Sequence, residues 1–118
     1  MKLRNLTPHA INIYIQNNDT DWPVIYTIPA EGVVPRVIYA DAEIFSTVDV
    51  GEMSINIFKA GKVSHIEDLP PVETGVLLIV SRLVAATAAA RDDLVFPDGL
   101  VRNKEGKIIG CRHLTCIN

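Results

Sequence analysis

The sequence predicts an α+β fold, a mainly antiparallel sheet with one or two short helices, and three observations support this. Short segments in which apolar and polar residues alternate are separated by turn-forming residues over the first two thirds of the chain, as in half-buried strands. One alanine-rich segment follows, and alanine favours helix. The 118 residues are 48% hydrophobic and 21% charged, which is typical of one globular domain, residues 1–118.

The first two alternating segments predict a hairpin. Isoleucine recurs at every second position of Ala10–Gln16, and Pro23–Ile28 repeats the pattern with Val24, Tyr26 and Ile28. Between them, Asn17-Asn18-Asp19 supplies a turn. Pro29–Gly32 supplies the next turn, because proline presets φ and glycine accepts a positive φ.

The middle of the chain predicts further strands. Val33–Ala40 is expected to be a strand in which Pro35 favours an edge or the strand start. Glu43–Val48 is either a short strand or a helical turn opened by Asp41. Ser54–Lys59 alternates again, whereas the polar segment Ser64–Thr74 contains two prolines and is expected to be a loop.

The last third predicts the centre of the fold. Val76–Val80 is a short run rich in branched residues, typical of a central strand that is buried on both faces. Ser81 can cap a helix over Arg82–Ala90, with a shorter second helix near Asp41–Phe45 as the alternative to a strand. A final hairpin is expected from Leu100–Asn103 and Lys107–Leu114 around Lys104-Glu105-Gly106.

The net charge of −3 predicts no attraction to bulk nucleic acid, although a local arginine cluster can still bind a small anion. The N-terminus lacks the apolar core of a secretory leader, and the longest apolar run, Val76–Val80, is too short to span a bilayer. We therefore expect a cytoplasmic protein without a membrane partner. Cys111 and Cys116 are expected to be free thiols, since they point to opposite faces of a strand.

Binding chemistry is concentrated in residues 91–110. Arg91 and Arg102 can grip phosphate oxygens, while Asp93 and Asn103 can bond ribose hydroxyls or a base edge. Phe96 can stack on a base. Two further candidates lie elsewhere, Arg36 at a strand boundary and His9 in the segment NLTPH. With no nucleophile and base beside them, these groups predict binding without catalysis.

Each candidate also has a structural interpretation. Arg91 can form an ion pair with Asp93, Asn103 can be a turn residue that bonds its own backbone, and Phe96 can anchor a minor core. His9 can be satisfied by nearby backbone. Cys111, His113 and Cys116 do not share one strand face and lack a fourth ligand, so we expect neither a metal site nor a cofactor.

Five motifs occur in a recognisable order: NLTPHAINIY, IPAEGVVPRV, LLIVSRLVAAT, RDDLVFP and VRNKEGKIIGCRHL. Together they resemble the phage proteins of the first Thoeris anti-defence family over nearly the whole chain. The resemblance implies a sponge for glycocyclic ADP-ribose, the signal made by bacterial Thoeris TIR proteins, which is held without cleavage in the host cytoplasm. It also implies homo-oligomers, hexamers built from dimers with nucleotide pockets where chains meet. Some members sequester cyclic oligonucleotides at a second site.

On the motifs and their chemistry together, the ligand-binding role falls first to Arg102 and Asn103, then to Arg36, Phe96 and Asp93, followed by Arg91 and His9. Two other functions remain open. The protein could be a small nucleotide hydrolase that uses His9 or the pair Asp92-Asp93. It could also be a structural phage component whose strands exist for assembly.

Overall fold

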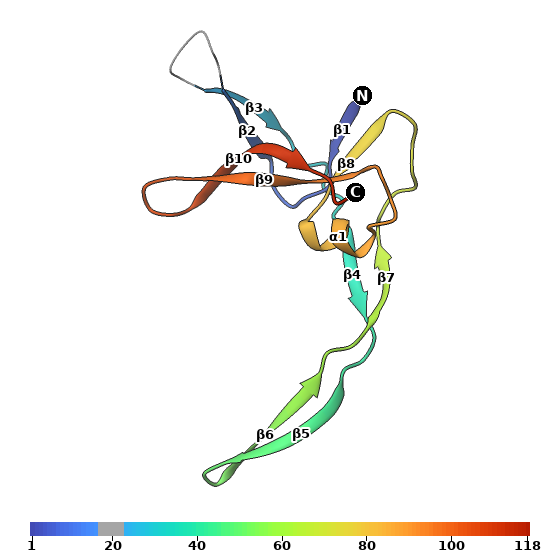
Figure 1. Ribbon diagram of the computed structural model, residues 1–118, viewed down its shortest axis with the longest axis vertical. Helices are drawn as coiled ribbons and strands as arrows, with labels where there is room; N and C mark the ends of the chain where they lie inside the picture. The colour runs from blue at the N-terminus through green and yellow to red at the C-terminus, as the bar shows by residue number, and fades with distance from the viewer. Residues whose placement is uncertain (17–22) are drawn as a thin grey trace.

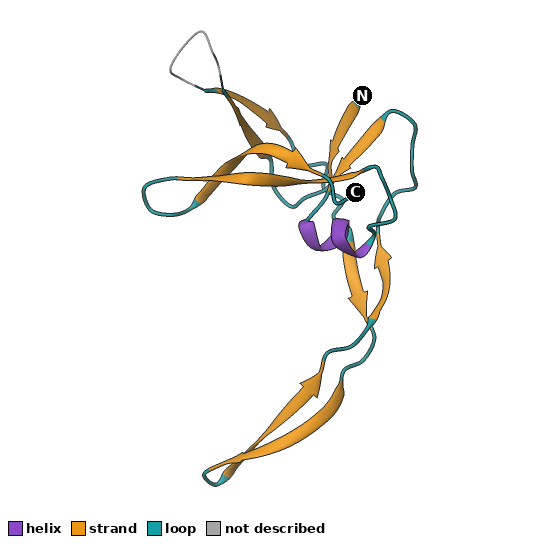
Figure 2. Cartoon of the chain, in the orientation of Figure 1, coloured by secondary structure: helices purple, strands orange, loops and turns teal. Residues whose placement is uncertain are grey.

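The computed structural model describes residues 1–16 and 23–118, which form strands and one short helix (Figures 1 and 2). In chain order the elements are β1 (Lys2–Asn5), β2 (Ile11–Ile15), β3 (Val24–Ile28), β4 (Arg36–Tyr39), β5 (Glu43–Val50), β6 (Met53–Lys59), β7 (Val63–Glu67), β8 (Val76–Ile79), α1 (Arg82–Thr87), β9 (Leu94–Arg102) and β10 (Ile108–Thr115). The predicted turn at Asn17-Asn18-Asp19 lies outside the described residues.

Six of the strands form one sheet in the order β1-β8-β9-β10-β2-β3. The predicted α+β class with one short helix is confirmed, and the six-stranded sheet is mixed rather than purely antiparallel. β8 runs parallel to both β1 and β9, and β10 runs parallel to β2, whereas β9–β10 and β2–β3 are antiparallel hairpins. The parallel pairs arise because crossovers, including helix α1 between β8 and β9, return the chain in the same direction.

Strand β8 lies in the middle of the parallel part and is buried on both faces, as its composition predicts. Leu78 belongs to a core cluster on the helix side, which includes Val84 and Phe96. Ile79 belongs to a second cluster on the opposite face, which includes Val95 and Cys111. The sheet therefore has two cores, and neighbouring residues of β8 and β9 belong to different ones.

Helix α1 begins where the sequence predicts and ends earlier. The Ser81 hydroxyl accepts a hydrogen bond from the backbone N–H of Val84 at 3.2 Å, and α1 buries Val84 and Ala85 against the sheet. The helix ends at Thr87 rather than Ala90, because the backbone of Ala88 (φ −101°, ψ 42°) leaves helical geometry, although its N–H still makes the last helical hydrogen bond to Val84. Among the described residues, no helix is long and apolar enough to cross a membrane.

A buried asparagine holds the start of the chain in place. Asn5 is 1% exposed, and its Nδ2 donates to the carbonyl oxygens of His9 and Ile28 at 2.9 and 3.0 Å. Its Oδ1 accepts from the backbone N–H and the hydroxyl of Thr7 at 3.0 and 2.6 Å. One amide thus joins β1, the loop before β2 and the end of β3. The sequence did not predict β1, since Lys-Leu-Arg-Asn carries little strand pattern.

The remaining four strands form an arm that leaves the sheet beside α1 (Figure 1). β4 pairs with β7 at its base, where Val37 and Ile66 pack against the core. β5 pairs with β6 farther out, so residues 43–50 are a strand and the helical alternative near Asp41 is wrong. The loop prediction for Ser64–Thr74 is wrong over its first residues, which belong to β7. Strand β7 depends on its pairing with the distant β4, and its own short sequence, Val63–Glu67, carries little alternating pattern.

The arm makes the molecule elongated. Its radius of gyration is 19.1 Å and its extents are 65 × 40 × 26 Å, whereas a compact chain of this length has a radius of gyration of about 13.5 Å. Pro35 precedes the arm, and β4 begins only after it because proline has no N–H for the ladder. The strand predicted from Val33 is therefore shorter than expected.

Replacing Asn5 by alanine should lower the free energy of unfolding by about 2–4 kcal/mol, because the carbonyls of His9 and Ile28 would lose a buried partner. Urea unfolding followed by circular dichroism measures this. Asn56→Ala is the control. Asn56 accepts one exposed hydrogen bond from Thr47 at 3.2 Å, so its loss should cost about 0.5 kcal/mol. Equal losses in the two variants would contradict the role of Asn5.

Candidate functional site

Arg91 and Asp93 form a two-pronged ion pair at the start of β9. Arg91 Nε donates to Asp93 Oδ1 at 2.8 Å and Nη2 donates to Oδ2 at 2.6 Å, while Nη1 bonds the carbonyl of Pro70 at 2.8 Å. Asp93 is 5% exposed. The hydrogen bonds from Arg91 lower the pKa of Asp93, against the opposing effect of burial. Both side chains are therefore engaged in holding the segment around Pro70 against the sheet.

Phe96 is part of the core. Its side chain is 3% exposed within the cluster beneath α1, and the guanidinium of Arg82 lies 5.4 Å from its ring centroid. A cation at this distance interacts favourably with the ring. Of the two interpretations of Phe96, core anchor and stacking platform, the geometry of the single chain matches the anchor.

Asn103 and Arg102 lie where β9 turns into β10. Asn103 Oδ1 accepts from the backbone N–H groups of Glu105 and Lys107, both at 3.0 Å, so this side chain stabilises its own turn. Arg102 Nη1 donates to the carbonyl of Gly106 at 2.9 Å. The Arg102 side chain is exposed, and this bond occupies one of its five N–H donors. Arg102 therefore keeps donors for a ligand.

A hollow of about 330 Å³ lies over strands β2, β9 and β10, and we call it the hairpin hollow. It is lined by His9, Ala10, Ile11, Asn12, Pro97, Leu100, Ile108, Ile109, Gly110 and Cys111. Its floor is mostly apolar, with Cys111 only 1% exposed. His9 is the predicted site residue that lines this hollow. Arg102 does not line it, although it is the ladder partner of Ile108, which does.

Arg36 is not brought to this hollow within one chain. It is the first residue of β4, is exposed and is the ladder partner of Glu67 at the base of the arm. The β9–β10 hairpin extends away from that base (Figure 1). Of the seven predicted site residues, all within the described part of the chain, the hollow is lined by His9 alone, while Arg102 and Asn103 lie farther along the β9–β10 hairpin. Arg91, Asp93 and Phe96 are engaged within the fold.

Sequence reasoning missed the apolar floor of the hollow. Leu100 and Ile108 are each 47% exposed. Large apolar residues within a predicted hairpin were the sequence feature that could have indicated this floor. Asn12 was also missed. Its Oδ1 accepts from the Thr27 hydroxyl at 2.7 Å and its Nδ2 donates to the carbonyl of Ile109 at 3.3 Å, so it fixes β2 against β3 and β10.

The hollow contains little reaction chemistry. Burial raises the pKa of the Cys111 thiol, which keeps the sulfur protonated at neutral pH and weakens it as a nucleophile. Within residues 1–16 and 23–118, no group of three or more His, Cys, Asp or Glu side chains is arranged to hold a metal ion. The side chains that line the hollow can make apolar contacts and hydrogen bonds to a ligand.

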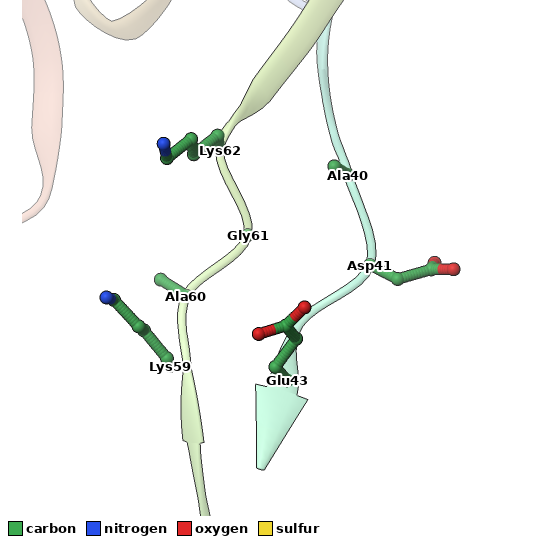
Figure 3. Close-up of a pocket in the computed structure, with 7 residues that line it drawn as sticks. All are labelled: Ala40, Asp41, Glu43, Lys59, Ala60, Gly61 and Lys62. Atoms are coloured by element: carbon green, nitrogen blue, oxygen red, sulfur yellow. The ribbon is translucent and has the colours of Figure 1, made fainter. Parts of the chain in front are cut away.

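A second hollow, of about 380 Å³, lies at the elbow between the two ribbons of the arm and is lined by Ala40, Asp41, Glu43, Lys59, Ala60, Gly61 and Lys62. Figure 3 shows that Asp41 points away from Lys59 and Lys62, whereas Glu43, the ladder partner of Lys59, points toward the facing strand. The backbones approach closely here: a Cβ on Gly61 would lie 1.9 Å from the carbonyl oxygen of Ala40. We interpret the elbow as a joint of the arm.

Comparison with protein-family models, with curated proteins and with solved structures gives no match to this chain.

Replacing Asp93 by asparagine should destabilise the fold at pH 7 by about 2–3 kcal/mol, because Arg91 would lose a charged partner. The pKa of Asp93 is lowered in the folded state, so its contribution is fully present above the unfolded value of about 3.9 and is lost as pH falls through the folded value. The stabilities of wild type and Asp93→Asn should therefore converge in acid.

Urea unfolding at several values from pH 7 down to about pH 2.5 measures this convergence. Asp92→Asn is the matched control, since Asp92 is the exposed neighbour and its replacement should leave the pH profile unchanged. A constant difference between Asp93→Asn and wild type at every pH would show that the ion pair is not the source of the acid sensitivity.

Proposed function

We propose that this protein sequesters a small anionic nucleotide of the cyclic ADP-ribose type without cleaving it, as a sponge of the kind that its five motifs resemble. The observation that carries this function is the hairpin hollow, whose mostly apolar lining includes His9, with the exposed Arg102 paired along the ladder with the lining residue Ile108. Signal capture of this kind in the host cytoplasm would prevent activation of the downstream immune effector.

The chemistry of the hollow suits the parts of such a ligand. Arg102 can bond the pyrophosphate with paired N–H groups. The apolar floor around Leu100 and Ile108 offers a surface for the adenine, and His9 offers a polar contact at the opposite end. A volume of about 330 Å³ lies at the small end of ligand pockets. Further contacts from a second chain of a homo-oligomer would complete the enclosure.

Within a single chain, Asp93 and Phe96 are occupied by contacts inside the protein. They were expected to hold the ribose and the base, but Asp93 accepts hydrogen bonds from Arg91 and Phe96 lies in the core. Arg36 could contribute only across a chain–chain interface. We therefore assign the ligand first to Arg102 and His9, with Asn103 holding the turn that presents Arg102. No described residues stand out for a second, cyclic-oligonucleotide site.

A hydrolase is the first alternative, and the geometry gives it less support. Asp93 is held in an ion pair and burial raises the pKa of the Cys111 thiol. Within residues 1–16 and 23–118, no side-chain hydrogen bond links the exposed His9 or Asp92 to a catalytic partner. A structural assembly protein is the second alternative, and one observation favours it: the long arm exposes many apolar side chains.

A retention experiment separates the three functions. Purified protein is incubated with glycocyclic ADP-ribose, freed of unbound ligand by gel filtration and heat-denatured, and the supernatant is analysed by mass spectrometry. Intact ligand in stoichiometric amount supports the sponge. A product of altered mass would identify an enzyme, and the absence of any retained nucleotide would leave the assembly function.

Arg102→Ala should weaken retention by about 10- to 100-fold, as expected for loss of charge-assisted hydrogen bonds. Titration calorimetry measures the change. Arg112→Ala is the matched control, because Arg112 is an exposed arginine next to Cys111 whose side chain leaves the opposite face of β10. The Arg112→Ala variant should bind glycocyclic ADP-ribose with the affinity of the wild type. Unchanged affinity in Arg102→Ala would place the ligand elsewhere.

A further inference from the structure

We propose that the Thr7 hydroxyl positions His9 at the hairpin hollow, through the loop that joins β1 to β2. This role rests on the proposed function of the hollow, because a fixed imidazole matters only where a ligand binds. We call residues 5–9, with the sequence Asn-Leu-Thr-Pro-His, the NLTPH loop. His9 lines the hollow and Thr7 does not, so Thr7 acts on a ligand only through His9.

The NLTPH loop is anchored to the sheet before the chain reaches Thr7. Strands β8, β9 and β10 lie between β1 and β2 in the sheet, so the loop has to carry the chain past them (Figure 1). Leu6 is fully buried in the core cluster beneath α1, and its N–H donates to the carbonyl of Ile79, the last residue of β8, at 2.8 Å. Asn5 Nδ2 bonds the carbonyl of Ile28 at 3.0 Å. The start of the loop is therefore fixed to both β8 and β3.

The Thr7 hydroxyl connects this anchor to His9. Its oxygen lies 2.6 Å from Asn5 Oδ1 and 3.1 Å from the carbonyl oxygen of His9, and its single proton is shared between these two acceptors. The same His9 carbonyl accepts from Asn5 Nδ2 at 2.9 Å. Pro8 lies between the two residues, and its ring fixes φ. The backbone of His9 is thus held in one position, and with it the direction of the Cα–Cβ bond.

His9 is the polar lining side chain whose position matters most for a ligand. The rest of the lining is mostly apolar, and the amide of Asn12 is already bonded to Thr27 and Ile109. The imidazole of His9 has no hydrogen-bond partner among the described residues. When a binding group samples several positions, the apparent affinity falls with the fraction of time that it spends in the competent one. Loosening the His9 backbone should therefore weaken binding without removing a ligand contact.

Thr7→Val removes the hydroxyl with little change in side-chain shape. It should weaken binding of glycocyclic ADP-ribose, measured by titration calorimetry, by about 3- to 10-fold. Thr7→Ser keeps the hydroxyl and should bind like wild type. Thr47→Val is the matched control, because the Thr47 hydroxyl donates to Asn56 Oδ1 at 3.2 Å in the arm, and it should also bind like wild type. An equal loss of affinity in Thr7→Ser and Thr7→Val would overturn the role of the hydroxyl.

A double-mutant cycle separates positioning of His9 from a general effect on the fold. In a His9→Ala background, Thr7→Val should change the affinity by less than about twofold, because the side chain that Thr7 positions is already absent. The same loss of affinity in the wild-type and His9→Ala backgrounds would show that Thr7 supports the fold and does not act through His9. That result would contradict the proposal.

A measurement without ligand keeps this role distinct from the nucleotide function. The backbone order parameter of His9, obtained from NMR relaxation, should be about 0.85 in wild type and in Thr7→Ser and should fall toward about 0.6 in Thr7→Val. If the wild type binds no glycocyclic ADP-ribose, the nucleotide function fails, while the order parameters still show whether Thr7 holds His9. Equal order parameters in wild type and Thr7→Val would rule out positioning by Thr7, whatever the binding data show.

Discussion

The fold depends on one constraint: strand β8 must bury both of its faces. Its run of branched residues cannot face water on either side, so Leu78 requires a core beneath α1 and Ile79 requires another on the opposite face. Two parallel neighbours, β1 and β9, satisfy its edges. On β9, Val95 and Phe96 are buried in the same way, one in each core. The side chains at the centre of the sheet therefore pack against one another, and a ligand would have to contact strands that extend beyond this centre.

Two such elements exist, and they differ in chemistry. The outer half of β9 continues past the core and pairs with β10, which places Arg102 beyond the packed region while the floor of the hollow stays apolar. The arm leaves on the side of α1 and exposes large apolar side chains such as Ile44, Phe45 and Met53. The β9–β10 hairpin thus carries the exposed Arg102 beyond a hollow with a mostly apolar lining. The arm exposes large apolar side chains together with the charged residues Glu43, Asp49, Glu52 and Lys59.

Sequence patterns predicted those parts of the fold whose cause is local. The alternation in residues 10–16, the cap at Ser81 and the apolar run at 76–80 each specify an element through their own residues, and the structure confirms them. Strands β1 and β7 depend instead on partners distant in sequence, β8 and β4, and their own residues carry little pattern. The same division applies to the site. Whether Phe96 stacks on a ligand or packs in a core is decided by α1 above it, which spacing along β9 does not reveal.

Arg91 and Asp93 are bonded to each other, so a ligand could reach either side chain only by breaking their ion pair. A sponge that must hold its ligand tightly needs donors that are already positioned and not satisfied by the protein itself, because breaking an internal ion pair would offset the binding free energy. The pair at Arg91 fails this condition, and Arg102 meets it, since one bond to Gly106 orients its guanidinium and leaves further donors free. Arg102 therefore differs from Arg91 in having a single bond to the protein that leaves its remaining donors without a partner among the described residues.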